Sequence, residues 1–336
     1  MRDEQILDVT DLTLRFGADK SGQGGLLAVN NVSFGLNRQE TLSIVGESGS
    51  GKTTIGRCIA RLYEPNAGQI TFRSEGGEVD LTHMSKAELR PIRQQIQMLF
   101  QDPNASLNSR MRIGDLVAEP LNIHRIGTPA ERRDRVVSLL ERVGLGADTV
   151  NRYPHQLSGG QRQRVGIARA LTVSPRLLIC DEPVSALDVS VQAQVLNLLR
   201  DLQDEMGLSY IFVSHDLGVV DYISDRVMVL YLGTIMELAT RDDLFAAPAH
   251  PYTRALLDAM PSRRDGRHRK RKVLTGEIAG PTLKRQGCVF AGRCPHATDL
   301  CQREAPVLRP WARNPATSVA CHHADALDLS TEETTI

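Results

Sequence analysis

The sequence predicts an α/β fold in which buried parallel strands carry a glycine-rich loop, with an antiparallel β-subdomain and an inserted helical subdomain attached. Three observations support this prediction. A short apolar run at 42–45 leads into the glycine-rich stretch 46–54 and then into an apolar helical segment. Two more apolar runs, at 177–180 and 210–213, end in polar or charged residues. Apolar residues spaced by three and four between 113 and 145 indicate helices.

The composition is that of an ordinary folded protein. The 336 residues suffice for two domains of about 150 residues each. The 40 Lys and Arg balance 40 Asp and Glu, so no net field points to nucleic acid or to an anionic membrane. The apolar runs are far shorter than the roughly 20 residues that span a bilayer, and the first residues lack the apolar core of a signal peptide. We therefore expect the chain to stay in the cytosol unless a partner holds it at a membrane.

The first part of the chain alternates apolar and polar residues over 6–16 and 28–36, which predicts two half-buried antiparallel strands. Phe16 closes the first strand. Its ring could stack on an adenine base or could be a core aromatic at a strand end, and position alone favours neither. A strand-rich patch at 68–72 and a strand at 96–100 follow, the latter ending at Gln101. A strand end beside a phosphate loop is where an α/β sheet presents residues that contact a ligand.

The glycine-rich stretch has the spacing and context of a phosphate-binding loop. Its glycines allow successive backbone N–H groups to converge, and the helix that follows adds its positive N-terminal end. Lys52 would reach the β- and γ-phosphates, and the Thr53 hydroxyl would bind Mg²⁺. A glycine-rich turn with an incidental lysine is the alternative, which the complete motif between a strand and a helix disfavours. The candidate residues are Gly46, Glu47, Ser48, Gly49, Ser50, Gly51, Lys52, Thr53 and Thr54.

A second candidate anion site lies at residues 157–161, Leu-Ser-Gly-Gly-Gln, before a helical run. Ser158 is a good N-cap, and Gly159 and Gly160 leave the backbone N–H groups of the helix start open, with Gln161 beside them. One nucleotide does not need two such sites. Two chains that face each other head to tail would use both, each closing the site of the other.

Two further strand ends supply candidate catalytic groups. The strand at 177–180 ends in Asp181, placed to hold Mg²⁺, and Glu182, placed to polarise an attacking water. The strand at 210–213 is followed by His215, which could contact the γ-phosphate and that water. A lone histidine is usually structural, but the strand ends at Gln101, Asp181–Glu182 and His215 should converge on the phosphate loop. Asp188 opens the next helix.

The character of the sequence changes after residue 240. We expect a nucleotide-binding domain over 1–240, with its helical subdomain at about 102–160, and a C-terminal extension over 241–336. The basic run 263–272 could contact nucleic acid or anionic lipid, or be a solvated linker. No aromatic residues interleave it to support base stacking.

Six cysteines fall unevenly along the chain. Cys58 and Cys180 sit in apolar segments and are expected to be packed, reduced thiols. The other four crowd the C-terminal extension with spacing C-x5-C-x6-C-x19-C, which lacks the paired C-x2-C of many zinc sites. An iron–sulfur cluster, zinc and free thiols all remain open from this spacing. A metal would help to stabilise so small a unit. The four residues are Cys288, Cys294, Cys301 and Cys321.

These residues resemble an ABC-type ATPase over about 240 residues. The resemblance implies a P-loop NTPase (RecA-like) core that binds ATP and Mg²⁺, with Thr53, Gln101 and Asp181 around the metal. It implies that Lys52, Gln101, Glu182 and His215 serve hydrolysis. Phe16 takes the place of an aromatic that is more often tyrosine. The matching motifs are Walker A at 46–54, the Q-loop at Gln101, the signature at 157–161, the end of Walker B at 179–182, the D-loop at 185–188 and the switch histidine at His215.

The segments 45–52, 153–161, 181–190 and 250–257, with the C-terminal cysteines, look like the ATPases of bacterial dipeptide/oligopeptide importers, of the DppF/OppF-like type. The resemblance implies a second ABC ATPase subunit, different from this one, two transmembrane permeases and an extracytoplasmic substrate-binding protein. It implies a peripheral position at the cytoplasmic face of the bacterial inner membrane and no nucleic-acid partner. It also implies a [4Fe–4S] cluster, in preference to zinc, at the four cysteines. The segment 102–121 is expected to dock the permease.

Two functions of other classes are alternatives to this one. ATPases of nucleic-acid machines share the cassette, but they usually carry two cassettes or long coiled coils, and this chain has zero net charge. A cluster-bearing regulatory subunit, in which hydrolysis is secondary, is the other. Within the importers, nickel chelates, opines or glutathione are alternatives to peptides, since selectivity lies in the other subunits.

Overall fold

The computed structural model describes residues 5–17, 25–102, 106–260 and 286–329, so the basic run 263–272 lies outside the described residues. One sheet is antiparallel, with strand order β2-β1-β4-β5. Val9 pairs with Phe34 in it, which confirms the two predicted N-terminal strands. Its strands are β1 (Gln5–Phe16), β2 (Leu26–Asn37), β4 (Ala67–Ser74) and β5 (Gly77–Asp80).

The second sheet is mixed, with strand order β11-β12-β10-β9-β3-β8-β7-β6. Its parallel part runs from β9 to β6, and β3 lies between β9 and β8. The remaining strands pair antiparallel along one edge. The strands are β3 (Thr41–Val45), β6 (Ile96–Leu99), β7 (Leu177–Asp181), β8 (Ser209–Ser214), β9 (Arg226–Tyr231), β10 (Thr234–Thr240), β11 (Arg309–Trp311) and β12 (Asn314–Val319).

The parallel strands are buried on both faces, which is why they appear in the sequence as continuous apolar runs. On β7, Leu177 and Ile179 join the core shared with the antiparallel sheet and α1 (Lys52–Ile59). Leu178 and Cys180 join a second core beneath the helices of the opposite face. Successive side chains of β7 point to opposite faces of the sheet, so this strand contributes to both cores and both layers pack on one sheet.

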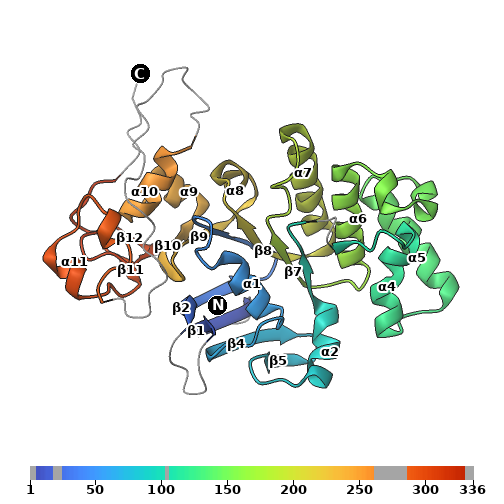
Figure 1. The fold of residues 1–336 in the computed structure, drawn as a ribbon, viewed down its shortest axis with the longest axis horizontal. Helices are drawn as coiled ribbons and strands as arrows, with labels where there is room; N and C mark the ends of the chain where they lie inside the picture. The colour runs from blue at the N-terminus through green and yellow to red at the C-terminus, as the bar shows by residue number, and fades with distance from the viewer. Residues whose placement is uncertain (1–4, 18–24, 103–105, 261–285, 330–336) are drawn as a thin grey trace.

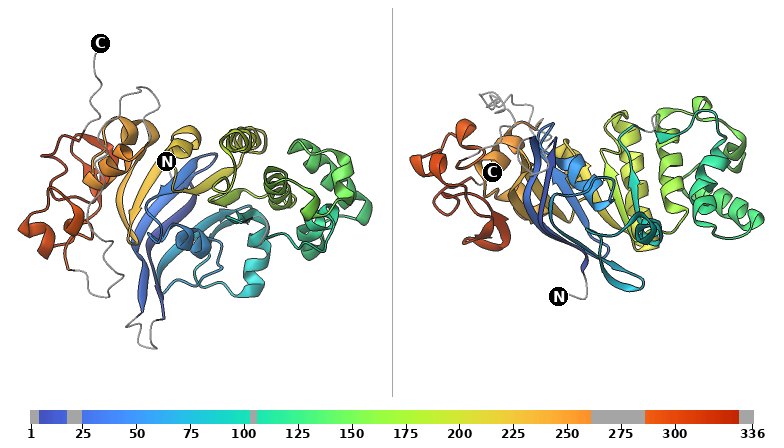
Figure 2. Two further views of the ribbon diagram at one scale, coloured as in Figure 1. Left: turned by 45° about the horizontal axis from the view of Figure 1, so that its top comes forward. Right: turned by 60° about the horizontal axis from the view of Figure 1, so that its bottom comes forward.

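The helices of the predicted helical subdomain lie at one end of the molecule, and other helices cover the sheet faces (Figures 1 and 2). The predicted helical region contains α4 (Ile113–His124) and α5 (Pro129–Arg142), which pack against α6 (Gly159–Leu171). Short 3₁₀ turns, η2 (Ala147–Asn151) and η3 (Pro154–Gln156), link them to α6. The other helices on the sheet are α7 (Val189–Met206) and α8 (Leu217–Ile223).

The helix α2 (Lys86–Gln95) was not among the elements predicted from the sequence. Ser85 accepts from the backbone N–H of Glu88, and the Glu88 side chain accepts from the backbone N–H of Ser85. The Ser-x-x-Glu spacing of this capping box is visible in the sequence and could have found the helix start.

The C-terminal segments lie at the other end of the molecule, opposite the helical subdomain (Figure 1). They comprise α9 (Arg241–Ala246), α10 (Pro251–Asp258), η4 (Ala291–Arg293) and α11 (Asp299–Arg303), together with β11 and β12. Glu237 of β10 pairs with Val319 of β12, so the end of the chain extends the main sheet. A third core, with Tyr231, Tyr252 and Phe290, joins these segments to β9. Among the described residues, no helix is both long and apolar enough to cross a membrane.

Candidate functional site

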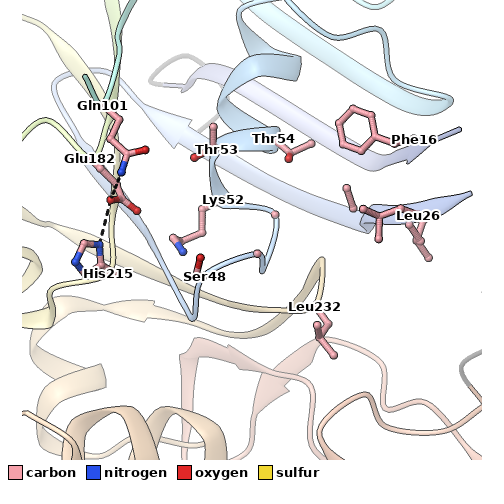
Figure 3. Close-up of a pocket in the computed structure, with 14 residues that line it drawn as sticks. Phe16, Leu26, Ser48, Lys52, Thr53, Thr54, Gln101, Glu182, His215 and Leu232 are labelled. Carbon is pink, nitrogen blue, oxygen red and sulfur yellow. Dashed lines mark hydrogen bonds and ion pairs between the residues drawn. The ribbon is translucent and has the colours of Figure 1, made fainter. Parts of the chain in front are cut away.

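A cavity of about 550 Å³ opens beside the glycine-rich loop between β3 and α1. Figure 3 shows Phe16 and Leu26 on one side of it, Gln101, Glu182 and His215 on the opposite side, and Lys52 between them. The structure thus brings the loop together with the ends of β1, β6, β7 and β8. The lining residues are Phe16, Leu26, Leu27, Ala28, Ser48, Gly49, Gly51, Lys52, Thr53, Thr54, Gln101, Glu182, His215 and Leu232.

The backbone of the loop lies directly against two strands. Gly46 has φ +151°, and a Cβ there would lie 2.1 Å from the carbonyl oxygen of Leu230 in β9. Gly51 has φ +100°, and a Cβ there would lie 2.3 Å from the carbonyl oxygen of Ala28 in β2. Only glycine fits at either position, because both the space and the backbone angle exclude a side chain.

Lys52 is buried at the start of α1, and its Nζ donates to the carbonyl oxygens of Gly46 and Glu47, each at 2.9 Å. Burial lowers the pKa of Lys52, while the nearby carboxylates of Glu182 and Asp181 act in the opposite direction. The ammonium group is therefore held over the loop, where it can bind a phosphate oxygen.

Thr53 and Asp181 form the oxygen-rich part of the site. Thr53 Oγ1 donates to Asp181 Oδ1 at 2.6 Å, and the Asp181 residue is only 1% exposed. Burial raises the pKa of Asp181, and the hydrogen bond from Thr53 opposes that rise. A hydroxyl and a carboxylate side by side are ligands that suit Mg²⁺.

The side chain of Glu182 contacts both Gln101 and His215. Its Oε2 accepts a hydrogen bond from Gln101 Nε2 at 3.0 Å and lies 3.1 Å from His215 Nδ1 (Figure 3). Its backbone has φ +47°, a left-handed conformation that is uncommon outside glycine, and its N–H donates to the carbonyl oxygen of Val213 in β8. The two adjacent acids, Asp181 and Glu182, therefore have different partners: Asp181 contacts Thr53, and Glu182 contacts His215.

The far side of the cavity is aromatic and apolar. Phe16 is 37% exposed and packs edge-on against Tyr63, with ring centroids 5.3 Å apart. This cavity is also lined by four residues that were not predicted as site residues: Leu26, Leu27, Ala28 and Leu232. Leu26 pairs with Phe16 across the antiparallel strands. Its position follows from the pairing of the two strands. The predicted second strand began at residue 28, two residues later than β2 begins in the structure.

The second candidate anion site lies outside this cavity. Ser158 caps α6 as predicted: its Oγ accepts from the N–H of Gln161, and the Gln161 side chain accepts from the N–H of Ser158. Gly159 lines a separate cavity of about 300 Å³, which reaches Gln101. Gly160 and Asp188, the N-cap residue of α7, are also not among the residues that line the cavity at the phosphate loop.

Three members of the predicted phosphate loop also do not line that cavity: Gly46, Glu47 and Ser50. The backbone N–H of Glu47 donates to Tyr252 Oη at 3.0 Å, and the Glu47 carboxylate pairs with Arg293. The amide and the side chain of Glu47 therefore both contact the C-terminal segments, and its contact with nucleotide stays a prediction.

The four C-terminal cysteines line one small cavity together with several histidines. None of the four forms a disulfide. Burial raises the pKa of Cys288 and Cys321, and raises that of Cys294 to about 11. The set of donors is one that iron or zinc prefers. In the part of the chain that the structure describes, however, no three His, Cys, Asp or Glu side chains are arranged to hold a metal ion.

Comparison with known proteins gives two family matches. The model described as ABC transporter matches residues 29–185, and the one described as Oligopeptide/dipeptide transporter, C-terminal region, matches residues 236–301. The chain is 49% identical over 326 residues to the Bacillus subtilis oligopeptide transport ATP-binding protein AppF, covering 95% of this chain and 97% of that protein. It is 47% identical over 331 residues to the Salmonella typhimurium oligopeptide transport ATP-binding protein OppF, covering 96% and 97%.

A solved structure shares the fold. It is a dimeric ATP-binding cassette in a post-hydrolysis state with ADP and phosphate bound. The TM-score is 0.62 at 30% sequence identity, and the match covers 70% of this chain and 99% of that one. This likeness confirms the predicted α/β cassette fold and does not extend to the predicted cysteine-rich C-terminal unit.

Proposed function

The chain belongs to the ABC transporter family of ATP-binding proteins, and we propose that it is the ATPase subunit of an importer of di- or oligopeptides. It binds and hydrolyses ATP, and partner permeases use the resulting motion to move the peptide. One observation carries the site assignment: a single cavity joins the phosphate loop to Gln101, Glu182 and His215. Asp181 adjoins it through the hydrogen bond that it accepts from Thr53.

We assign the two halves of the cavity to the two halves of ATP. The adenine lies against Phe16 and the apolar residues around Leu26. The phosphates lie on the loop backbone and on Lys52. Thr53, Asp181 and Gln101 would hold Mg²⁺, which would supply positive charge to neutralise the phosphates.

Glu182 acts on the attacking water. Gln101 and His215 hold its carboxylate in one orientation, since both contact the same oxygen, Oε2. A carboxylate so fixed can accept a proton from a water placed beside the γ-phosphate. His215, 59% exposed at its side chain, lies where it can contact that phosphate.

Two chains complete each site in this proposal. The Ser158–Gln161 segment and Asp188 lie outside the chain's own cavity, so they are free to close the site of a second, different ATPase subunit. The N-terminus of α6 offers its N–H groups to the γ-phosphate there. The remaining partners are two permeases, docked on the segment 102–121, and an extracytoplasmic substrate-binding protein. The ATPase lies at the cytoplasmic face of the membrane.

Replacement of Glu182 by Gln tests the assignment. We expect ATP binding to persist and ATP hydrolysis by the assembled transporter to fall by about 10²- to 10⁴-fold, as for loss of a general base. Nucleotide affinity and phosphate release are measured on the same preparation. Hydrolysis at the wild-type rate would remove Glu182 from this role.

The domain boundaries and the metal are part of the proposal. Residues 1–240 form the nucleotide-binding domain, with the helical subdomain at about 102–160, and residues 241–336 form an extension. Its cysteines hold a [4Fe–4S] cluster, supported by four thiols that line one cavity. The protein should be purified without oxygen and its iron, sulfide and zinc counted per chain. About four irons are expected; one zinc and no iron would replace the cluster by zinc.

A further inference from the structure

The phosphate loop is tied to the C-terminal segments through Glu47. Arg293 Nη1 donates to Glu47 Oε2 at 2.7 Å and Arg293 Nη2 donates to Glu47 Oε1 at 3.0 Å. The two side chains are 9% and 24% exposed. Two parallel hydrogen bonds between charged groups fix both the distance and the orientation of the carboxylate.

The same loop residue is held a second time through its backbone. Tyr252 of α10 is fully buried and accepts from the Glu47 N–H. Tyr231 of β9 links the two contacts: its hydroxyl accepts from Arg293 Nη1 at 3.3 Å, and its ring centroid lies 4.7 Å from that of Tyr252. Glu47 is thus fixed at its amide and at its carboxylate by one buried cluster.

The position of Arg293 depends on the cysteine-bearing segment. It ends η4, directly before Cys294, and its N–H donates to the carbonyl oxygen of Phe290. The Phe290 ring packs on Tyr231 and Tyr252 at centroid distances of 5.4 Å and 5.2 Å. The short turn η4, which Phe290 packs against Tyr231 and Tyr252, therefore places the guanidinium of Arg293 at the phosphate loop.

We propose that Arg293 is a positioning residue for ATP binding, acting through Glu47 to hold the phosphate loop in shape. This rests on the proposed ATP site. Glu47 lies between Gly46 and Ser48, and the carbonyl oxygens of Gly46 and Glu47 both accept from Lys52 Nζ. A shift of Glu47 therefore moves the groups that orient Lys52. Arg293 also neutralises a carboxylate that would otherwise stand unpaired beside a triphosphate.

Nucleotide affinity of the full chain tests the proposal. Calorimetric titration with a non-hydrolysable ATP analogue and Mg²⁺ should show Arg293→Met raising Kd about tenfold or more, since a partly buried charge loses its partner. Arg293→Lys should recover part of the affinity, because it restores the charge but not the two parallel bonds. In the assembled transporter, KM for ATP should rise with little change in kcat.

A double-mutant cycle separates positioning from general damage. Adding Glu47→Gln to Arg293→Met should recover part of the affinity, because it removes the unpaired charge. Effects that simply add, or a wild-type Kd for Arg293→Met, would overturn the proposal. If Arg293→Met fails to fold, Kd is measured for Arg293→Lys and for Glu47→Gln instead. A wild-type Kd in both variants would overturn the proposal.

Two controls accompany the cycle. Arg309→Met removes another ion pair of the C-terminal segments, 2.7 Å from Asp325, and should leave Kd unchanged; an equal rise in Kd would show general damage and overturn the proposal. Absence of analogue binding in the wild-type chain would instead refute the proposed ATP site itself.

Discussion

Phe16 shows how one side chain can be defined by its neighbours. From the sequence its ring had two interpretations, a base-stacking group or a strand-end core residue. In the structure the ring contacts Tyr63 by its edge and remains 37% exposed at the rim of the cavity. Tyr63 therefore supports the ring without covering it, and stacking of the ring on adenine stays a prediction.

We predict that Phe16→Ala weakens binding of ATP by about five- to tenfold, which corresponds to the free energy of one lost aromatic contact. Phe16→Tyr is the matched control and should bind ATP within about twofold of wild type, since it keeps the ring. Fluorescence titration of both variants measures this. Equal affinities for Phe16→Ala and wild type would place the adenine elsewhere.

The phosphate loop depends on elements that lie far from it in sequence. Gly46 touches β9 and Gly51 touches β2, so the loop is shaped by two strands as well as by its own glycines. This dependence separates glycines that the fold requires from those that face open space, such as Gly49.

We predict that Gly46→Ala destabilises the chain by about 3 kcal/mol or more, because its Cβ would meet the backbone of Leu230 at a positive φ. Gly49→Ala should cost only about 1 kcal/mol, since its φ is +77° but nothing lies within 4 Å of the new Cβ. Urea unfolding without nucleotide compares the two. A larger loss for Gly49→Ala would contradict the packing described above.

At the scale of the whole molecule, the C-terminal segments contact both the main sheet and the phosphate loop. The C-terminal segments add β12 to the main sheet and reach the phosphate loop through Tyr252 and Arg293. They also gather the four cysteines beneath α10 in one cavity lined by His250 and Pro251. The same segments therefore bear on both the proposed ATP site and the proposed metal site.

Three partly buried cysteines give a pH prediction. Burial raises the pKa of Cys288 and Cys321 and raises that of Cys294 to about 11. In the metal-free chain these thiols should be largely protonated at pH 7.5, so alkylation by iodoacetamide should be slow there. The rate should rise about tenfold per pH unit, since only the thiolate reacts and its fraction grows with pH below the pKa.

Mass spectrometry of labelled peptides measures the rate at each cysteine. Cys180 is the internal control and should stay unlabelled, because it is buried in the second core beneath β7. Fast labelling of Cys294 at pH 7.5 with no increase toward pH 10 would contradict the burial of its thiol.

The sequence by itself determined the cassette and the polar strand ends. Apolar runs mark the parallel strands because both faces of that sheet are covered, and Lys52, Asp181 and Glu182 stand in motifs whose chemistry is local. Helix starts such as Ser158 were also visible, because capping depends on residues three positions apart.

Only the tertiary structure decided which distant groups meet. The pair Arg293–Glu47 joins residues 246 positions apart, and the role of Tyr252 as an acceptor for the loop depends on how α10 packs on β9. Neither contact has a sequence signature, because periodicity and motifs report local order, whereas ion pairs between segments depend on how the chain folds back on itself.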